Sequence, residues 1–168
     1  MISQIVTDRL VMRPLVAADG DRVVEMLNNY SVSQWLARVP FPFSHSDLRI
    51  LDENGGSRWP GLMGISLDGT LIGGLSCGTD FGYYLTPAFW GRGLATEAGR
   101  AVLETYFQQT QANQIGAGYF PNNAPSKRVL DKLGFKYLRR GRQHCTAQGA
   151  DLDHVEVELT RADWEAQQ

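Results

Sequence analysis

Several short segments between glycine, proline and aspartate residues either alternate hydrophobic with polar residues or gather β-branched and aromatic ones. This pattern predicts β-strands, whose side chains point alternately to opposite faces of a sheet. Asp68-Gly69 is a strong two-residue turn signal, so the strands before and after it should form a hairpin. Gly73 and Gly74 inside the later of these strands indicate a bulge or the close approach of another backbone. The expected strands cover residues 7–15, 59–67, 70–76, 81–85, 115–120, a segment beginning at 135–138, and 154–159.

Apolar residues spaced three or four apart predict helices between these strands. The longest covers residues 93–109, where Leu94, Ala98, Val102 and Tyr106 share one face. The element order is strand, helices, three strands, helix, strand, helix and two strands, an α/β or α+β arrangement around one mixed sheet. Residues 40–43, Pro-Phe-Pro-Phe, should form a stiff non-helical loop. Shorter helices are expected from an Asp19 N-cap to residue 27, as a turn at 33–39, from a cap at Ser44 or Ser46 to residue 52, at 125–133 and at 161–166.

Composition narrows the class of protein. The chain has 168 residues, of which 43% are hydrophobic, enough for one domain over residues 1–168 with a substantial core. A formal net charge of −2 argues against a dedicated nucleic-acid-binding protein, which is usually basic. Two cysteines without CxxC spacing, a start without a signal-peptide pattern and no apolar run of about 20 residues predict a cytoplasmic protein with no membrane partner. His45, His144 and His154 are expected at surface or packing positions, and no residue cluster has metal-ligand spacing, so we expect no metal.

The segment from Tyr83 to Ala98 combines a strand end, a turn with Gly91 and Gly93, and a helix start. Glycines let backbone amides point inward, and the free amides and dipole at a helix N-terminus favour an anion such as phosphate. A plain strand-to-helix turn is the alternative. The phosphate-loop pattern GxxxxGK[ST] is absent, and Thr96 replaces the third glycine of a dinucleotide fingerprint, so a mononucleotide or dinucleotide site of these types is not expected.

A second segment, from Asn123 to Phe135, adds to this pattern. Together with the turn Trp90-Gly91-Arg92-Gly93-Leu94-Ala95 it resembles the GNAT superfamily of acyl-CoA-dependent N-acetyltransferases, which carry a [QR]-x-x-G-x-[GA] turn after the fourth strand. The resemblance is to the branch that contains the ribosomal-protein N-terminal (alanine/serine) acetyltransferases, the Rim type, and it spans nearly the whole chain. The motifs that carry it are Trp90 in place of Gln or Arg, Thr96-Glu97-Ala98, Gly82-Tyr83-Tyr84-Leu85, Asn123-x-x-Ser126, Lys132-x-Gly134-Phe135, Thr7-Asp8-Arg9-Leu10-x-Met12-Arg13 and Leu159-Thr160-Arg161-x-x-Trp164.

The resemblance implies a GNAT-like α/β (α+β) fold, in which a mixed, mostly antiparallel central sheet contains a splayed pair of parallel strands and is flanked by helices. It also implies acetyl-CoA as the co-substrate, with the pyrophosphate on the glycine turn and the pantetheine arm along strand 81–85. Arg92 and Lys127 would meet phosphates, or they are solvated side chains. The implied cofactor-binding residues are Tyr84, Leu85, Trp90, Gly91, Arg92, Gly93, Leu94, Ala95, Thr96, Asn123, Ser126 and Lys127.

The resemblance implies Ser126 and Asp80 as catalytic residues. Many family members protonate the leaving thiolate with a tyrosine, but Leu130 occupies that position here. In the Rim-type branch a serine supports the leaving thiol, which indicates Ser126; a simple helix cap is the alternative. Asp80 stands where this branch often carries a glutamate, and it would take the amine proton directly or through water. A turn aspartate without catalytic function is the alternative for Asp80.

The acceptor amine is expected over the loops before the hairpin. Trp35, Phe41, Phe43 and His45 are candidate substrate-binding walls there, or they serve core and loop packing. An α-amine, with a pKa of about 7.7–8.0, needs a weaker base than a lysine amine at about 10.4, so a site without a strong base favours an α-amine. We therefore expect acetyl transfer to a peptide or protein N-terminus by direct attack in a ternary complex, by a monomer or homodimer. A small-molecule amine acceptor (an antibiotic, a polyamine or an amino-acid analogue) and a non-catalytic acyl-CoA sensor are the alternatives.

Overall fold

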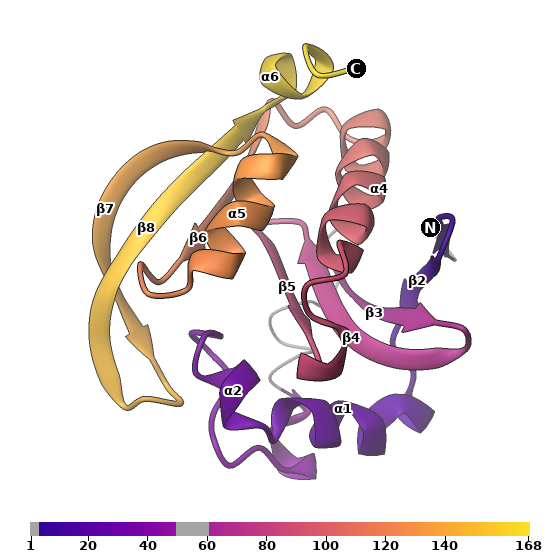
Figure 1. The fold of residues 1–168 in the computed structure, drawn as a ribbon, viewed down its shortest axis with the longest axis vertical. Helices are drawn as coiled ribbons and strands as arrows, with labels where there is room; N and C mark the ends of the chain where they lie inside the picture. The colour runs from indigo at the N-terminus through magenta and orange to yellow at the C-terminus, as the bar shows by residue number, and fades with distance from the viewer. Residues whose placement is uncertain (1–3, 50–60) are drawn as a thin grey trace.

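Eight strands form two antiparallel sheets in the part of the chain that the computed structural model describes, residues 4–49 and 61–168 (Figure 1). The first sheet is a meander in which each strand pairs with the next along the chain. Its strands are β1 (Ile5–Val6), β2 (Leu10–Pro14), β3 (Gly61–Leu67), β4 (Thr70–Cys77) and β5 (Phe81–Leu85). The second sheet has the order β6 (Gln114–Tyr119), β8 (Ala150–Thr160) and β7 (Lys136–Cys145).

The two sheets meet between β5 and β6. Asp80, just before β5, forms a parallel bridge with Gly116 of β6. Within residues 4–49 and 61–168 this is the only β-pairing between the two sheets. The structure therefore confirms the expected mostly antiparallel fold with a splayed parallel pair. It corrects the expectation of one continuous mixed sheet, because a single bridge joins two separate sheets.

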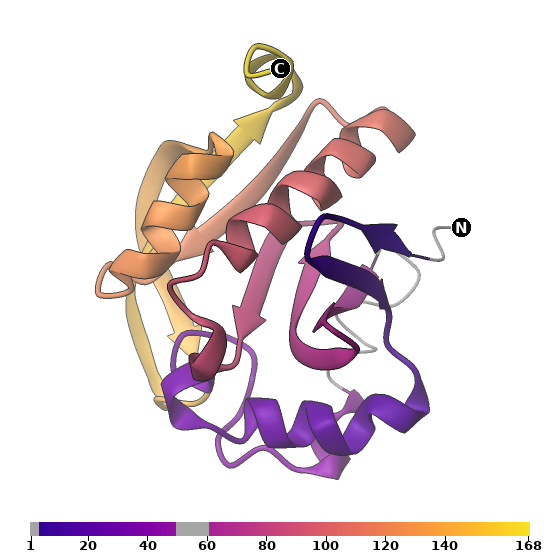
Figure 2. The same ribbon diagram turned by 45° about the vertical axis from the view of Figure 1, so that its right-hand side comes forward.

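Helices cover both faces of the strands (Figures 1 and 2). The two longest lie next to each other on one face, beside the junction of the sheets, and two shorter helices pack near the other end of the first sheet. No helix in the described residues is long and apolar enough to span a membrane. The helices are α1 (Gly20–Leu27), α2 (Tyr30–Ser33), α4 (Leu94–Gln109), α5 (Ala124–Leu133) and α6 (Arg161–Glu165), with short 3-10 turns at Ala17–Asp19, His45–Asp47 and Pro87–Phe89.

Two groups of buried side chains hold these layers together. The larger group combines residues of both sheets with α4, α5 and Trp164 of α6, and it fills the space on the face that α4 and α5 cover. The smaller group combines α1 and α2 with Val39, Phe43, Leu71 and Tyr84. Leu71 lies on β4 and Tyr84 on β5, so these strands contribute to both groups and form the layer between them.

The hairpin and its turn agree with the sequence pattern. Asp68 (φ 50°) and Gly69 (φ 79°) both have positive φ, as a two-residue turn with the twist of a hairpin requires. Gly73 has no room for a side chain, because a Cβ there would collide with the Tyr84 carbonyl oxygen. The close backbone approach that was expected at this glycine is confirmed. The start of the expected strand 59–67 and the end of the expected helix to residue 52 lie outside the described residues.

Three local expectations differ from the structure. The helical turn expected at residues 33–39 is not a helix, because α2 covers Tyr30–Ser33 and ends where the expected turn begins. Asp19 stands at the N-cap position of α1, but its carboxylate accepts two hydrogen bonds from Arg13 and one from the Val16 N–H, so it anchors β2 instead of capping α1. β7 and β8 are longer than expected, since they pair with each other through most of their lengths. Exposed residues along β7 hide the alternation by which a half-buried strand is recognised.

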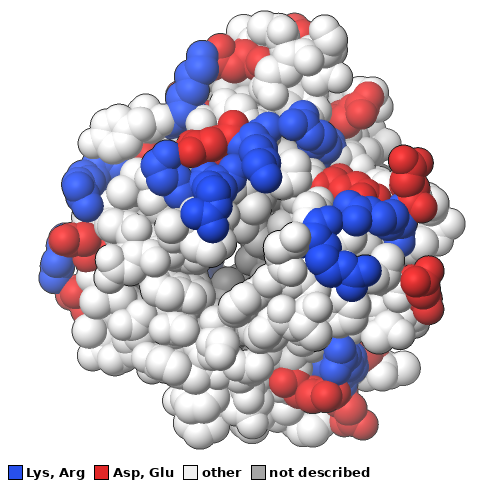
Figure 3. All heavy atoms as spheres, in the orientation of Figure 1, with Lys and Arg blue, Asp and Glu red and all other residues white. Residues whose placement is uncertain are grey.

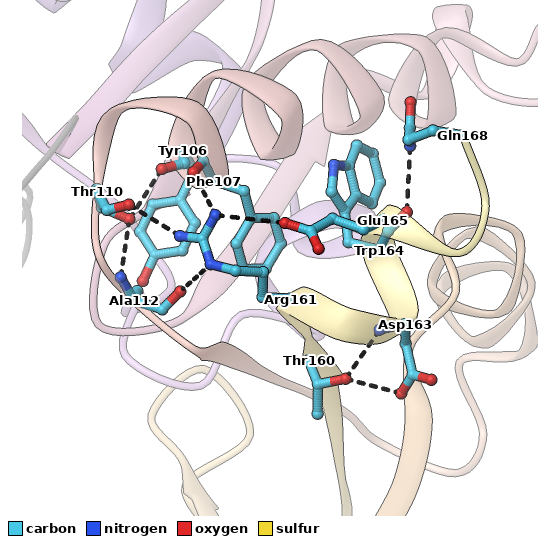
Figure 4. Close-up of polar contacts among 10 residues, drawn as sticks. All are labelled: Tyr106, Phe107, Thr110, Ala112, Thr160, Arg161, Asp163, Trp164, Glu165 and Gln168. Atoms are coloured by element: carbon cyan, nitrogen blue, oxygen red, sulfur yellow. Dashed lines mark hydrogen bonds and ion pairs between the residues drawn. The ribbon is translucent and has the colours of Figure 1, made fainter.

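Arg161 closes the C-terminal end of α4 (Figure 4). Its Nη1 donates to the Phe107 carbonyl (2.6 Å), its Nη2 to Thr110 (2.8 Å) and its Nε to Ala112 (3.0 Å). The guanidinium also lies 5.2 Å from the centre of the Phe107 ring. The last carbonyls of a helix have no partner within the helix and carry partial negative charge, so a cation there satisfies and stabilises them. This contact fixes the end of the second sheet to α4.

We expect Arg161→Met to lower the free energy of unfolding by roughly 2 kcal/mol, because it removes charged hydrogen bonds to the end of a helix. Urea unfolding followed by circular dichroism measures this change. Arg142→Met is the matched control: Arg142 lies in an exposed ion pair with Asp153, and such pairs are worth at most about 1 kcal/mol. Equal effects of the two substitutions would contradict the specific role of Arg161.

Candidate active site

The glycine turn between β5 and α4 presents backbone amides at the start of the longest helix. Gly91 (φ 71°) and Gly93 (φ 75°) both have positive φ, which L side chains rarely adopt. Gly93 is the N-cap residue of α4, and no side chain among the described residues caps the helix. The indole Nε1 of Trp90 donates to the Leu85 carbonyl (2.7 Å) and fixes the turn to the end of β5. The first amides of α4 therefore face outward without a side-chain partner, an arrangement that favours an anion.

Arg9 lies against the same turn. Its Nη1 donates to the Arg92 carbonyl (3.0 Å), and its Nε and backbone N–H donate to the two oxygens of Glu97 (2.7 and 3.0 Å). Thr7 donates to Glu97 as well (2.6 Å). Burial alone would raise the pKa of Glu97, but the hydrogen bonds from Thr7 and Arg9 outweigh it and hold that pKa below its ordinary value. An ionised Glu97 thus positions the Arg9 guanidinium beside the N-terminus of α4.

A shallow depression opens beside these residues. It has a volume of about 470 Å³ and is lined by Thr7, Asp8, Gly93, Thr96, Glu97 and Arg100. Figure 3 shows Lys and Arg side chains gathered on the face that carries α4 and α5, on two sides of a hollow. The exposed basic residues of α4, α5 and the glycine turn include Arg92, Arg100, Arg128 and Lys132, and Arg9 contacts the turn. Their positive charge adds to that of the helix N-terminus and favours an anionic ligand.

The splay leaves one edge of β5 open next to this turn. β5 pairs with β4 along its whole length, from Phe81 opposite Cys77 to Leu85 opposite Gly73. Its other edge meets β6 only at the Asp80–Gly116 bridge within the described residues. Apart from the Leu85 carbonyl, which accepts from Trp90, the backbone N–H and C=O groups on that edge are therefore available to a ligand that enters the splay. An extended ligand with amide groups would match them.

Two hydroxyl groups meet on the side of β5 that α5 covers. Tyr83 faces α5, and its hydroxyl forms a hydrogen bond with the hydroxyl of Ser126 in the first turn of that helix. Burial raises the pKa of Tyr83, and the bond to Ser126 offsets only part of this, so the phenol stays protonated. Leu130, where many family members have a tyrosine, is only 3% exposed and belongs to the core. The phenol beside Ser126 belongs to Tyr83 of β5.

Asp80 lies on the other side of the strand. Side chains alternate along β5, so Asp80, Gly82 and Tyr84 point away from the face that Tyr83 occupies. Asp80 is exposed, and its Oδ1 would lie 3.2 Å from a Cβ built on Gly116. The two residues with expected catalytic roles, Asp80 and Ser126, are thus not brought together but lie on opposite faces of the splay.

The other expected cofactor-binding residues lie in different environments. Leu94 and Ala95 are buried, so only their backbone groups could meet a ligand. Tyr84 turns its ring toward Gly74 and the smaller core, away from α5. Thr96 lines the depression, Asn123 is the N-cap residue of α5, and Arg92 stacks over Phe89 at 5.6 Å. Lys127 is exposed and pairs with Asp131 at 2.7 Å, the arrangement of a surface side chain.

The expected acceptor walls do not form one surface. Phe43 is 2% exposed and packs in the smaller core, so its packing role is the one that the structure supports. Phe41 is partly exposed and packs edge-on against Tyr30 at 5.3 Å. His45 is exposed, with its Nε2 2.6 Å from the Asp21 carboxylate on α1. Trp35 is half-buried just after α2.

Three residues of the site were absent from the sequence-based set: Tyr83, Arg9 and Glu97. Tyr83 could have been found from strand alternation, since it shares a face with the apolar Phe81 and Leu85. Arg9 and Glu97 were visible only as parts of motifs, because their contact joins residues 88 positions apart. Among the described residues, no group of three or more His, Cys, Asp or Glu side chains could hold a metal ion.

Comparisons with known proteins agree with this geometry. The family model described as an acetyltransferase (GNAT) domain matches residues 9–136. The Bacillus subtilis protein named "Probable N-acetyltransferase YjcK" is 36% identical over 82 residues, which make up 49% of this chain and 45% of that protein. The Escherichia coli ribosomal protein uS5-alanine N-acetyltransferase is 36% identical over 84 residues, 49% of this chain and 43% of the enzyme. The alignments therefore span less than half the length of these two relatives.

A solved structure extends the similarity over more of the chain. The structure of Mycobacterium smegmatis RimJ in complex with CoA-disulfide superposes with a TM-score of 0.76. The sequence identity is 23%, and the match covers 92% of this chain and 83% of RimJ. At this identity the match shows that the two chains share a fold.

Proposed function

Because this chain belongs to the GNAT acetyltransferase family, we propose that it transfers the acetyl group of acetyl-CoA to a primary amine. The amine attacks the thioester directly while both substrates are bound. The observation that carries this proposal is the glycine turn at the uncapped N-terminus of α4, placed directly beside the open edge of β5. One end of this arrangement suits a pyrophosphate, and the other suits an extended chain of amides.

The residues of the turn fit coenzyme A. Gly91 and Gly93 give the backbone amides a concave arrangement, and the N-terminus of α4 adds its dipole. Arg9 supplies a fixed positive charge, and Thr96 supplies a hydroxyl at the rim of the depression. The pantetheine amides would then pair with the free edge of β5. RimJ, which shares the fold, has CoA-disulfide in its structure and so supports this ligand class.

The Ser126–Tyr83 pair lies where it can serve the leaving sulfur. Both hydroxyls lie on the α5 side of β5, and the hydrogen bond from Ser126 acts to lower the pKa of Tyr83. When the C–S bond breaks, a hydroxyl at this position donates a hydrogen bond or a proton to the thiolate. The second hydroxyl supports the first. This explains how the chain manages without a tyrosine at position 130.

We propose the α-amine of a peptide or protein N-terminus as the preferred acceptor. Such an amine has a pKa of about 7.7–8.0, so a sizeable neutral fraction exists near neutral pH and no strong base is needed. The Escherichia coli relative, 36% identical over about half of this chain, is named as an alanine N-acetyltransferase of ribosomal protein uS5. Both observations favour an α-amine over a lysine side chain.

The first prediction of this proposed function concerns coenzyme binding. Gly91→Trp should weaken coenzyme A binding by at least about tenfold, because a large side chain replaces free amide surface at the turn. Isothermal titration calorimetry with coenzyme A measures the affinity. Gly149→Trp is the matched control: Gly149 also has positive φ (63°) and open space around a Cβ, but it lies in the β7–β8 turn. Unchanged affinity in a folded Gly91→Trp protein would remove the turn from the binding site.

The second prediction concerns the hydroxyl pair. Ser126→Ala and Tyr83→Phe should each lower kcat by roughly tenfold or more, with the affinity for coenzyme A within about twofold of the wild type. The double variant should lose less than the product of the single losses, because the two groups act together. Steady-state thiol release measures the rates, and Tyr137→Phe at an exposed position of β7 is the control. Full activity of Ser126→Ala would reduce that residue to a structural role.

The third prediction concerns the acceptor. Thiol release from acetyl-CoA should be fastest with peptides that begin with Ala or Ser, and slower with N-acetylated peptides that contain lysine, polyamines and aminoglycosides. Mass spectrometry of the products should place the acetyl group on the α-nitrogen. Faster turnover of a small amine would show instead that the protein is a small-molecule acetyltransferase. Coenzyme A binding with no thiol release from any acceptor would identify a sensor instead.

A further inference from the structure

On the face opposite Ser126, the gap between β5 and β6 is lined by glycines, which we call the glycine floor. Ile115 and Ala117 of β6 point into the larger core, so the alternate residues Gly116 and Gly118 face the other way. On β5 the residue on this face nearest the bridge is Gly82, which also lacks a side chain. Counting two residues from the Asp80–Gly116 bridge along the two parallel strands places Gly82 across the splay from Gly118. These three glycines therefore contribute no side chains to this face of the gap between the strands.

His154 reaches over this floor from the neighbouring strand. Its position on β8 is opposite the core face, since Val155 and Val157 are buried and alternate with it. Its imidazole covers Gly118, where any Cβ would collide with Cε1, and its Nε2 would lie 2.6 Å from that Cβ. The ring also packs edge-on against Phe120 at 5.2 Å. The imidazole thus lies over Gly118 of β6, the strand that borders the gap.

Charged groups surround the imidazole unevenly. Burial lowers the pKa of His154, and the nearby Glu156 carboxylate opposes this only in part, so the ring is neutral near pH 7. Glu156 is itself paired with Arg139 on β7 at 2.5 Å. Asp80 lies over Gly116, about 7 Å along β6 from the ring at a strand rise of about 3.4 Å per residue. The titratable groups that face His154 on this side are Asp80 from β5, Glu156 and Glu158 from β8, and Arg139 and Lys136 from β7.

We propose that His154 is the general base that accepts the proton of the acceptor amine. This inference rests on the proposed acetyl transfer. The amine nitrogen forms a bond to the acetyl carbon, the C–S bond breaks, and the amine proton passes to Nε2 of His154. The sulfur receives a proton from the Ser126–Tyr83 pair on the opposite face, which is resupplied from water, and the imidazolium returns its proton to water. Asp80 stabilises the imidazolium across the glycine floor instead of acting as the base itself.

The test compares the pH dependence of thiol release by the wild type, His154→Gln and Asp80→Asn, from about pH 5.5 to 9.5. The acceptor is whichever member of the peptide and amine panel the wild type turns over. His154→Gln should lower kcat roughly 100-fold near pH 7, with KM for acetyl-CoA within about twofold, and its rate should keep rising with pH. Imidazole in the buffer should restore part of the activity of His154→Ala, which a merely structural role of the ring would not produce.

His144→Gln is the matched control, because His144 is an exposed histidine on β7 that pairs with Asp151 at 2.7 Å. It should keep the wild-type profile. A wild-type profile in His154→Gln, or a loss confined to Asp80→Asn, would overturn the role of His154 while leaving acetyl transfer intact. No thiol release by the wild type with any acceptor would instead overturn the proposed function, and this inference with it. Coenzyme A titration and thermal unfolding of each variant separate a lost base from a lost fold.

Discussion

The rest of the structure depends on the way β5 and β6 are joined once, at Asp80 and Gly116, and then held apart. The packing of α4 and α5 holds these two strands in place. Phe81 of β5 stacks on Phe135, which follows α5, at 5.6 Å, and Gly99 lets Leu133 of α5 pack directly on α4. A strand edge without partners is costly unless a ligand or water satisfies its backbone groups. The packing of α4 and α5 therefore keeps open an edge that would otherwise pair, and this edge is the proposed path of the coenzyme.

The splay also separates two kinds of chemistry. Side chains alternate along β5, so Tyr83 points to the face where it meets Ser126 of α5, while Asp80 and His154 of β8 lie on the opposite face. In the proposed reaction the leaving sulfur needs a proton donor, while the attacking amine needs a proton acceptor. When the proton donor and the proton acceptor lie on opposite faces, they can act in the same reaction without exchanging a proton directly. On the second face Gly116 and Gly118 have no side chains, and the side chains of Asp80 and His154 lie over them.

Sequence patterns located the elements whose conformation is local. The Asp68-Gly69 hairpin, the long helix α4 and the glycine turn before it agree with the structure, since turn residues and helical periodicity act over a few neighbouring residues. β7 was under-predicted, because both of its faces are exposed along most of its length and it lacks the alternation of a half-buried strand. The expectation for Asp19 as a helix cap failed for a tertiary reason, since Arg13 and the Val16 amide take its carboxylate.

By itself the sequence determined the positive-φ turn at Gly91 and Gly93, the helix that follows it and the spacing of Asn123 and Ser126, because these depend on backbone preferences within a few residues. Only the tertiary structure decided which side chains meet. Ser126 of α5 contacts Tyr83 of β5, and Arg9 pairs with Glu97. His154 packs over Gly118 because of the register of β6 against β8. A shift of the strand pairing by one residue would turn every side chain of the strand to the opposite face. The register therefore cannot be determined from a local sequence pattern.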